Sequence, residues 1–400
     1  MTHGLRVLSV YEGFFSGGAR IVHTDVVLGL REGGQYQRVL SVHGEMYREA
    51  TRQPMGEDAS YRALTAAGVE VTSLNRTLGL TGDPAAFTGR ELAATARAMA
   101  GADVILSLKE QPLGLLNQPG LPRRPVVVCL HRSDPENQGP ALDELKAAVA
   151  DGRVTAAVCC AESTRAAYQA AGIPGGLLHV IPNGVDLLRF RPDPARRTLL
   201  RACLGIPECA PVVVFAARYA GMKNVPLFLR AARAWLHDDP TAHIMMCGAG
   251  MTPANPGLHA DITAAFGDAP WLADRLHLLG VRQDMETLYA AADVVSLTSS
   301  SGEAAPLSLI EGMMCGAVPV STEVGDCAEI VGERGILTPP DPGLIAQAWT
   351  RAAACGTEYA PAIARSRERF SRTRMIASYA ALLDRVHQEM SSVARLPESL

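Results

Sequence analysis

The chain has 400 residues, 48% of them hydrophobic, and a formal net charge of −4. Its length suits two domains, given ~100–200 residues per domain. The slightly acidic charge gives no electrostatic basis for binding nucleic acid, and no apolar run approaches the ~20 residues of a membrane-spanning helix.

Cysteine usage indicates the redox compartment. The nine cysteines are scattered, with no Cys-x-x-Cys pair. We therefore expect reduced thiols in a cytoplasmic protein, and predict neither a disulfide framework nor a zinc site. The N-terminus runs into a strand without the apolar core of a signal peptide.

The first half of the chain alternates two kinds of segment. Apolar runs of strand length occur at 5–10, 38–42, 69–74, 104–108, 126–130 and 156–160, and helical windows occur at 88–100 and 141–150. This alternation predicts a parallel sheet covered by helices, a Rossmann-like domain. Ligands of such sheets bind at the carboxyl ends of the strands.

The loop after the first strand carries two glycines and two aromatic residues. Gly17 and Gly18 precede a helix expected to begin near Ile21, and permit close backbone approach to a ligand at its start. Phe14 and Phe15 lie in the same loop. They either line a ligand pocket or pack onto the domain.

Charged side chains follow two later strands. Lys109 and Glu110 come after the strand at 104–108, and His131 and Arg132 after the strand at 126–130. Their position at strand ends makes Lys109, Glu110 and Arg132 candidates for binding a ligand. A lone histidine in such a place is otherwise a structural group.

Two other segments show no clear hydrophobic periodicity. Residues 45–58 are polar and predict a loop or lid, or else a disordered stretch. Residues 180–186 contain Pro, Gly and Asp, which suit a linker. We place the domains at 1–188 and 189–374, followed by a C-terminal helical segment at 375–400.

The second domain opens with a strand at 212–217, followed by two cations. Arg218 and Lys223 occupy the turn before a helix that Asn224 is expected to cap. Cations in a turn are ordinarily surface charges. In a dry site, however, they stabilise the negative charge that develops on a departing phosphate.

A further strand–turn–helix unit lies near residue 300. The apolar run 294–297 predicts a strand, and 307–314 predicts a helix with Pro306 at its first position. The amides of Leu307 and Ser308 would then offer a seat for a diphosphate.

Two acids flank that seat. Glu303 lies before the helix and Glu311 within it, so both can accept hydrogen bonds from sugar hydroxyls. The stretch from Glu303 to Glu311, with its Gly-x-x-Pro-Val exit, resembles the Glu-seven-residues-Glu signature of the retaining glycosyltransferases of family 4, which have the GT-B fold. Ala304 and Ala305 depart from the family's usual Gly and bulky apolar residue, which predicts a differently shaped pocket wall.

The resemblance implies two facing Rossmann-like domains with an interdomain cleft, and a terminal helix that crosses back to the first domain. Arg218 and Lys223 resemble the cations that clamp the donor diphosphate, and His131 matches a histidine that reaches the transferred sugar. Glu303 completes the predicted catalytic set. The loop or lid at 45–58 would face the acceptor, and the acceptor-side candidates are Phe14, Phe15, Lys109, Glu110 and Arg132. The expected donor contacts are Gly17, Gly18, Gly248, Arg282, Ala304, Ala305, Pro306, Leu307, Ser308 and Glu311.

The implied reaction is transfer of a hexose with retention, without a cofactor or metal. The expected donor is UDP-glucose or UDP-N-acetylglucosamine, then GDP-mannose, and the expected acceptor is a small molecule. A lipid-linked or polysaccharide acceptor, a nucleotide-sugar epimerase and a non-catalytic binding protein are the alternatives. The basic run from Arg365 to Arg374 either contacts anionic lipid or is a solvated face.

Overall fold

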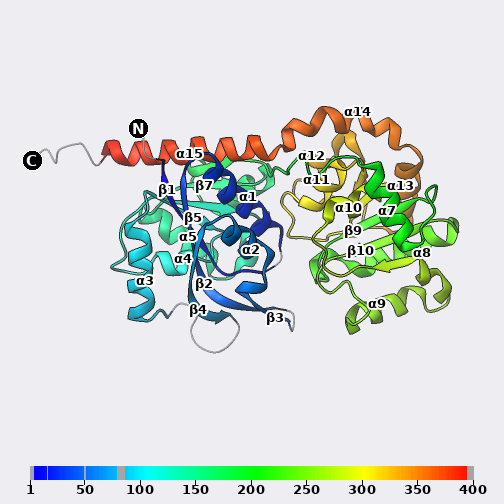
Figure 1. Ribbon diagram of the computed structural model, residues 1–400, viewed down its shortest axis with the longest axis horizontal. Coiled ribbons are helices and arrows are strands. Elements are labelled where there is room, and N and C mark those ends of the chain that lie inside the picture. Colours follow the sequence, from blue (N-terminus) through cyan, green and yellow to red (C-terminus); the bar gives the residue numbers. More distant parts are fainter. Residues whose placement is uncertain (1–3, 16, 49–50, 79–85, 394–400) are drawn as a thin grey trace, which may run out of the picture. The chain divides into compact units, whose positions relative to one another are not determined.

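The computed structural model describes residues 4–15, 17–48, 51–78 and 86–393. The chain forms two compact units (Figure 1). The N-unit comprises the residues up to Gly184 together with those from Arg372 onward, and the C-unit comprises Val185–Ser371. The predicted boundaries at 188 and 374 lie a few residues beyond these two points.

The N-unit contains one sheet in the order β3-β2-β1-β5-β6-β7-β8, with β4 pairing beside β2. All pairings are parallel except that of β2 with β3. β5 and β6 are fully buried runs of mostly Val and Leu, as expected for central parallel strands covered on both faces. The strands are β1 (Arg6–Tyr11), β2 (Tyr36–Arg48), β3 (Thr51–Pro54), β4 (Glu70–Leu78), β5 (Val104–Leu108), β6 (Val126–Leu130), β7 (Val154–Cys159) and β8 (Leu178–Val180).

Helices connect these strands, and the last helix of the chain joins the same unit. A capping box between Thr88 and Glu91 starts α3. α15 packs against α1 so closely that a Cβ on Gly29 would lie 2.1 Å from Ile376, and Arg372 pairs with Glu32 at 3.2 Å. The helices are α1 (Gly18–Glu32), α2 (Ala59–Ala66), α3 (Gly89–Ala100), α4 (Leu113–Leu116), α5 (Ala141–Ala150), α6 (Glu162–Ala170) and α15 (Arg372–Val393).

The C-unit contains a second sheet, parallel throughout, in the order β11-β10-β9-β12-β13-β14. Numbered from β9, this is the order 3-2-1-4-5-6 of the Rossmann fold, whose ligands bind where the order reverses. The strands are β9 (Val212–Ala216), β10 (His243–Cys247), β11 (Leu276–Leu278), β12 (Val294–Leu297), β13 (Val318–Ser321) and β14 (Ile336–Leu337). The reversal lies between β9 and β12.

The helices of the C-unit enclose an apolar core built around two tryptophans. Trp235 and Trp349 pack edge to face at 5.8 Å between ring centres, and the Trp349 indole N–H donates to Ser296 Oγ at 2.9 Å. The helices are α7 (Pro194–Leu204), α8 (Val225–Asp238), α9 (Pro256–Phe266), α10 (Met285–Ala290), α11 (Leu307–Met314), α12 (Cys327–Val331), α13 (Pro342–Ala354) and α14 (Gly356–Ser366).

The structure corrects several local predictions. α1 begins at Gly18 rather than near Ile21, because the Gly17 carbonyl already accepts the amide of Arg20. Residues 45–58 do not form a loop or lid: where described, they continue β2 and form a hairpin with β3, held by a pair between Glu45 and Arg52. Pro306 is the N-cap of α11 and not its first helical residue.

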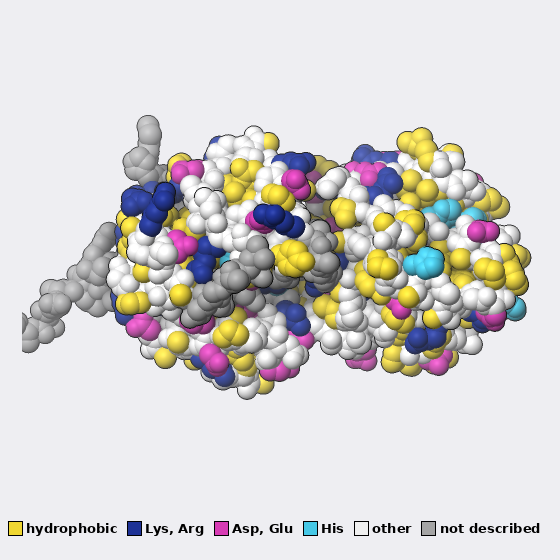
Figure 2. Space-filling view, turned by 90° about the horizontal axis from the view of Figure 1, so that it is seen from below, with side chains coloured by type: hydrophobic (Ala, Val, Ile, Leu, Met, Phe, Trp, Pro, Cys, Tyr) yellow, Lys and Arg dark blue, Asp and Glu magenta, His cyan; other side chains and the backbone are white. Residues whose placement is uncertain are grey.

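Charge is mixed on one face of each unit. On the face drawn in Figure 2, basic and acidic side chains lie interspersed over each unit. Within the described residues, no helix is both long enough and apolar enough to span a bilayer.

Candidate active site

The reversal point of the C-unit sheet brings together two residues predicted from distant parts of the sequence. β9 and β12 are neighbours, and the loops after them carry Lys223 and Glu303. The Lys223 ammonium donates to Glu303 Oε1, and Ser299 Oγ donates to the same oxygen at 2.6 Å. Glu303 is only 6% exposed. Its carboxylate is therefore oriented by a cation and a hydroxyl together.

Backbone contacts fix the position of Glu303. Gly325 has φ of +59°, and a Cβ at this position would lie 2.3 Å from the Glu303 carbonyl oxygen. The Asp326 amide donates to the Ala304 carbonyl at 2.8 Å. Only glycine combines this positive φ with such close approach, so Gly325 holds the acidic loop in place.

The end of β12 also braces the loop that carries Lys223. Thr298 Oγ1 donates to the Lys223 carbonyl at 3.2 Å, and the Ser300 amide donates to the Met222 carbonyl at 2.9 Å. Asn224 occupies the N-cap of α8 with φ of +49° and makes no side-chain cap bond, contrary to the predicted cap. It instead provides the left-handed residue that turns the chain from Lys223 into α8.

The start of α11 lies in the same loop as Glu303. Its N-cap, Pro306, provides no side-chain acceptor. In the described part of the chain, no acceptor is found for the amides of Leu307 and Ser308. Two amide donors at the positive end of a helix dipole can bind an anion such as a diphosphate.

Glu311, one turn into α11, is 8% exposed. It lies against Tyr289 of α10, whose pKa is raised well above its usual value by burial and then by the neighbouring Glu311 carboxylate. Sequence reasoning missed Tyr289 and Ser299. The serine run at 299–301 offered a signal only for Ser299.

The cation Arg218 lies two residues beyond the end of β9, next to a glycine turn. Gly248 has φ of +138°, and a Cβ there would lie 2.1 Å from the Ala217 carbonyl oxygen, so only glycine fits beside this loop. Arg282, predicted as a donor contact, forms a fork with Asp284, with Nε to Oδ1 at 2.9 Å. The structure thus gives Arg282 a partner within its own loop.

In the N-unit, the predicted residues lie at the carboxyl ends of β1, β5 and β6. Gly17 is the N-cap of α1, and Lys109 has a left-handed φ of +67°. His131 Nε2 is buried and has no hydrogen-bond partner among the described residues. Burial, and then the charge of Lys109, lowers the pKa of His131 to about 3. The imidazole is therefore neutral at pH 7 and can exchange hydrogen bonds with a sugar hydroxyl.

Glu110 is a buried acid at the same edge. It is 1% exposed, and its Oε1 has no hydrogen-bond partner among the described residues. Burial raises its pKa to about 7, although the charges of Lys109 and Arg132 act in the opposite direction. Arg132 itself forms a fork with Asp134, at 2.6 and 2.7 Å.

Replacing Glu110 with glutamine is expected to change how stability depends on pH. Native Glu110 holds its proton up to about pH 7, whereas the unfolded chain releases it near pH 4.5. Its contribution therefore lowers wild-type stability as pH rises through this window, by about 3 kcal/mol in total. We expect the free energy of unfolding of Glu110→Gln, measured in urea relative to that of wild type, to be higher at pH 8 than at pH 4.5. The same stability difference between variant and wild type at both pH values would contradict the raised pKa of Glu110.

The two aromatic residues of the loop after β1 differ in burial and in packing. Phe14 is fully buried and packs against Tyr11 and Tyr61, with ring centres 5.0 and 5.7 Å away. It therefore belongs to the core rather than to an acceptor pocket. Phe15 is half-buried, and the Arg20 guanidinium lies 3.2 Å above its ring. Arginine–aromatic stacking of this kind stabilises the loop itself.

The basic run predicted from Arg365 to Arg374 takes part in the packing of the chain. Arg369 pairs with Glu329 at 2.7 Å, and Arg367 and Arg374 donate to backbone carbonyls. Because these contacts use the guanidinium groups internally, they favour a structural role over lipid binding.

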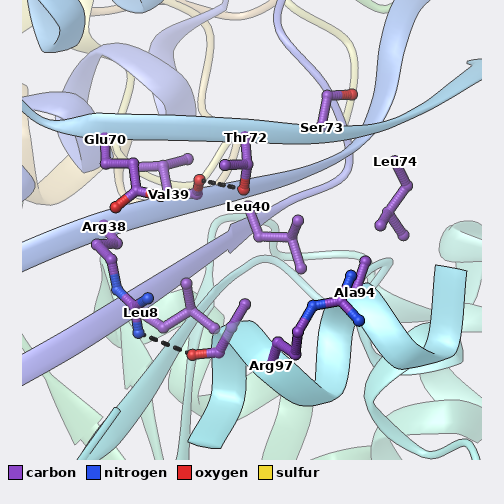
Figure 3. Close-up of a pocket in the computed structure, with 11 residues that line it drawn as sticks. Leu8, Arg38, Val39, Leu40, Glu70, Thr72, Ser73, Leu74, Ala94 and Arg97 are labelled. Atoms are coloured by element: carbon purple, nitrogen blue, oxygen red, sulfur yellow. Dashed lines mark hydrogen bonds between the residues drawn. The ribbon is translucent and has the colours of Figure 1, made fainter. Parts of the chain in front are cut away.

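A cavity of about 270 Å³ in the N-unit lies apart from the candidate site residues. It lies between α3 and the first halves of β2 and β4, with Arg38 and Arg97 near the apolar side chains of Leu8, Leu40 and Leu74 (Figure 3). The Arg38 guanidinium donates to the Ala98 carbonyl at 2.8 Å. The cavity contains none of the candidate residues, which follow the carboxyl ends of the strands.

Two family models match the sequence. Residues 210–354 match "Glycosyl transferases group 1", and residues 16–189 match "Glycosyltransferase Family 4". Curated relatives include the D-inositol 3-phosphate glycosyltransferases of Saccharomonospora viridis, 33% identical over 184 residues, and of Geodermatophilus obscurus, 32% identical over 229 residues. These matches cover 43% and 54% of this chain, and 40% and 49% of the relatives. The matched part is thus less than half of either relative.

Solved structures share the fold. Anabaena Alr3699/HepE in complex with UDP and glucose aligns with a TM-score of 0.76 at 23% identity, over 95% of this chain and 99% of that one. Sucrose-phosphate synthase from Thermosynechococcus elongatus aligns with a TM-score of 0.69 at 18% identity, over 97% and 100%. The chain therefore belongs to the group 1, family 4 glycosyltransferases and has their GT-B fold, with two parallel-sheet domains.

Proposed function

We propose that the protein is a retaining glycosyltransferase that moves a hexose from a nucleotide sugar to a hydroxyl of a small acceptor. The observation that carries this proposal is the Lys223–Glu303 pair beside the amides that open α11. A cation, a buried acid and a helix start at the reversal point of a Rossmann sheet suit a diphosphate with a sugar attached.

The donor is proposed to bind across this loop. Arg218, Lys223 and the Leu307 amide contact the diphosphate, and Glu311 accepts from the ribose hydroxyls. A phosphate oxygen on Lys223 would release Glu303 to accept from a hexose hydroxyl, while Ser299 keeps its carboxylate oriented. UDP-glucose is our first choice, because Alr3699/HepE was solved with it, followed by UDP-N-acetylglucosamine and GDP-mannose.

The acceptor is proposed to contact the N-unit residues His131, Glu110 and Lys109. The first two carry buried polar atoms without partners among the described residues, which a polyhydroxylated ligand would satisfy. The names of the curated relatives support a small cyclitol-type acceptor over a polymer.

The proposed chemistry needs no protein nucleophile. As the anomeric C–O bond breaks, negative charge grows on the β-phosphate, where Arg218, Lys223 and the α11 amides stabilise it. The departing phosphate takes the proton of the acceptor hydroxyl, and attack from the same face retains the anomeric configuration. In this scheme the two cations supply the charge that a divalent metal would otherwise provide.

A screen of nucleotide sugars by thermal shift tests the donor, because a ligand of the native state raises its apparent stability. The best donor is then incubated with cyclitols and simple sugars, and NMR identifies the product and its anomeric configuration. We expect UDP release only with an acceptor present. Tight binding without transfer would indicate a binding protein, and a changed sugar without an acceptor would indicate an epimerase.

A further inference from the structure

Tyr219 joins three segments around the predicted cation Arg218. It is the next residue along the chain, and its amide donates to the Ala249 carbonyl at 2.7 Å. Its hydroxyl donates to Asp261 Oδ2, in the middle of α9, at 2.8 Å. The loop after β9 is thus attached both to the turn after β10 and to α9.

Two glycines make the space in which the Tyr219 ring lies. A Cβ on Gly250, whose φ is +79°, would lie 2.8 Å from Tyr219 Cβ, and a Cβ on Gly257 would lie 2.9 Å from its hydroxyl oxygen. The side chain is half-buried. Burial and the bond to Asp261 raise the pKa of Tyr219, so it remains a donor at neutral pH. The contact is therefore specific to the phenol in this slot.

We propose that Tyr219 and Asp261 are a positioning pair, which fixes the Arg218 loop against the 248–250 turn and so places its cation for the donor diphosphate. This inference rests on the proposed function. Because Tyr219 is held at its amide and at its hydroxyl, the adjoining backbone of Arg218 has few conformations left. A positioned cation then binds a phosphate without first having to be ordered.

Isothermal calorimetry with UDP and with UMP tests the pair in Tyr219→Phe, Asp261→Asn and the double variant. Each single variant should lose roughly tenfold in UDP affinity, the size expected for one hydrogen bond to a charged group, and much less in UMP affinity. The double variant should be no weaker than the singles, because they break the same contact. Asp268→Asn, an exposed acid that pairs with Arg233, is the matched control and should bind both nucleotides like wild type.

The possible results separate the inference from the proposed function. Wild-type UDP affinity in Tyr219→Phe, or an equal loss for UDP and UMP, would overturn the positioning role. Arg218→Ala serves as the reference variant and should lose more UDP affinity than Tyr219→Phe. If Arg218→Ala bound UDP as tightly as wild type, the proposed donor site itself would be wrong.

Discussion

Replacing Lys223 with methionine is expected to lower kcat about 10²–10³-fold. In the proposed reaction, its ammonium stabilises charge that appears on the leaving phosphate only as the bond breaks, and losing one such preorganised donor costs about that factor. Donor binding should change less, since Arg218 and the α11 amides remain. Steady-state kinetics at saturating donor and acceptor measure the effect. Lys146→Met, on the exposed face of α5, is the control.

The same substitution is also expected to lower the stability of the fold, and this effect can be measured separately from catalysis. Without Lys223, the Glu303 carboxylate loses its cationic partner, and removing one partner of a buried ion pair destabilises the fold. Adding Glu303→Gln should restore much of the lost stability while leaving kcat low. A Lys223→Met enzyme with wild-type kcat would contradict the assigned role, whatever its stability.

Replacing Arg201 with methionine is expected to destabilise the C-unit by about 3–5 kcal/mol, because several carbonyl groups lose the donor that satisfies them. Arg201 is 1% exposed. It pairs with Asp293 at 2.9 Å, and its guanidinium also donates to the carbonyls of Pro207, Glu208, Ala210 and Ala291. Methionine would fill the volume but leave the four carbonyls without this donor, whereas Asp293 keeps Arg197 and the Val212 amide.

Chemical denaturation measures this effect, and an exposed pair provides the comparison. Arg233→Met removes a surface arginine that pairs with Asp268, and should cost no more than about 1 kcal/mol. Arg201 lies outside the candidate site, so the folded variant should keep its activity per molecule. A cost for Arg201→Met as small as that for Arg233→Met would show that the buried network contributes little.

Elements with an unambiguous pattern could be predicted from the sequence. The strand Val294–Leu297 and the helix Leu307–Met314 have the predicted bounds, because a short apolar run and an apolar helical face are separated by turn residues. β5 and β6 were predicted because each is a short apolar run of strand length. The family and its fold followed from the motif that these elements carry.

Other features depend on contacts that no local pattern encodes. β3 is an edge strand, and edge strands of this kind carry polar residues. The hairpin of β2 and β3 therefore has a sequence that is typical of a loop, and the local pattern did not predict it. The contact of Lys223 with Glu303 follows from the strand order of the C-unit, which places β12 beside β9. The burial of Phe14, in the loop before α1, depends on Tyr61 of α2.

The most direct test of the donor site is a crystal structure of the protein with UDP. Our proposal predicts the diphosphate within hydrogen-bond distance of Arg218, Lys223 and the amides of Leu307 and Ser308, with the ribose hydroxyls on Glu311. A nucleotide bound elsewhere in the chain, or a diphosphate without contact to either cation, would contradict it.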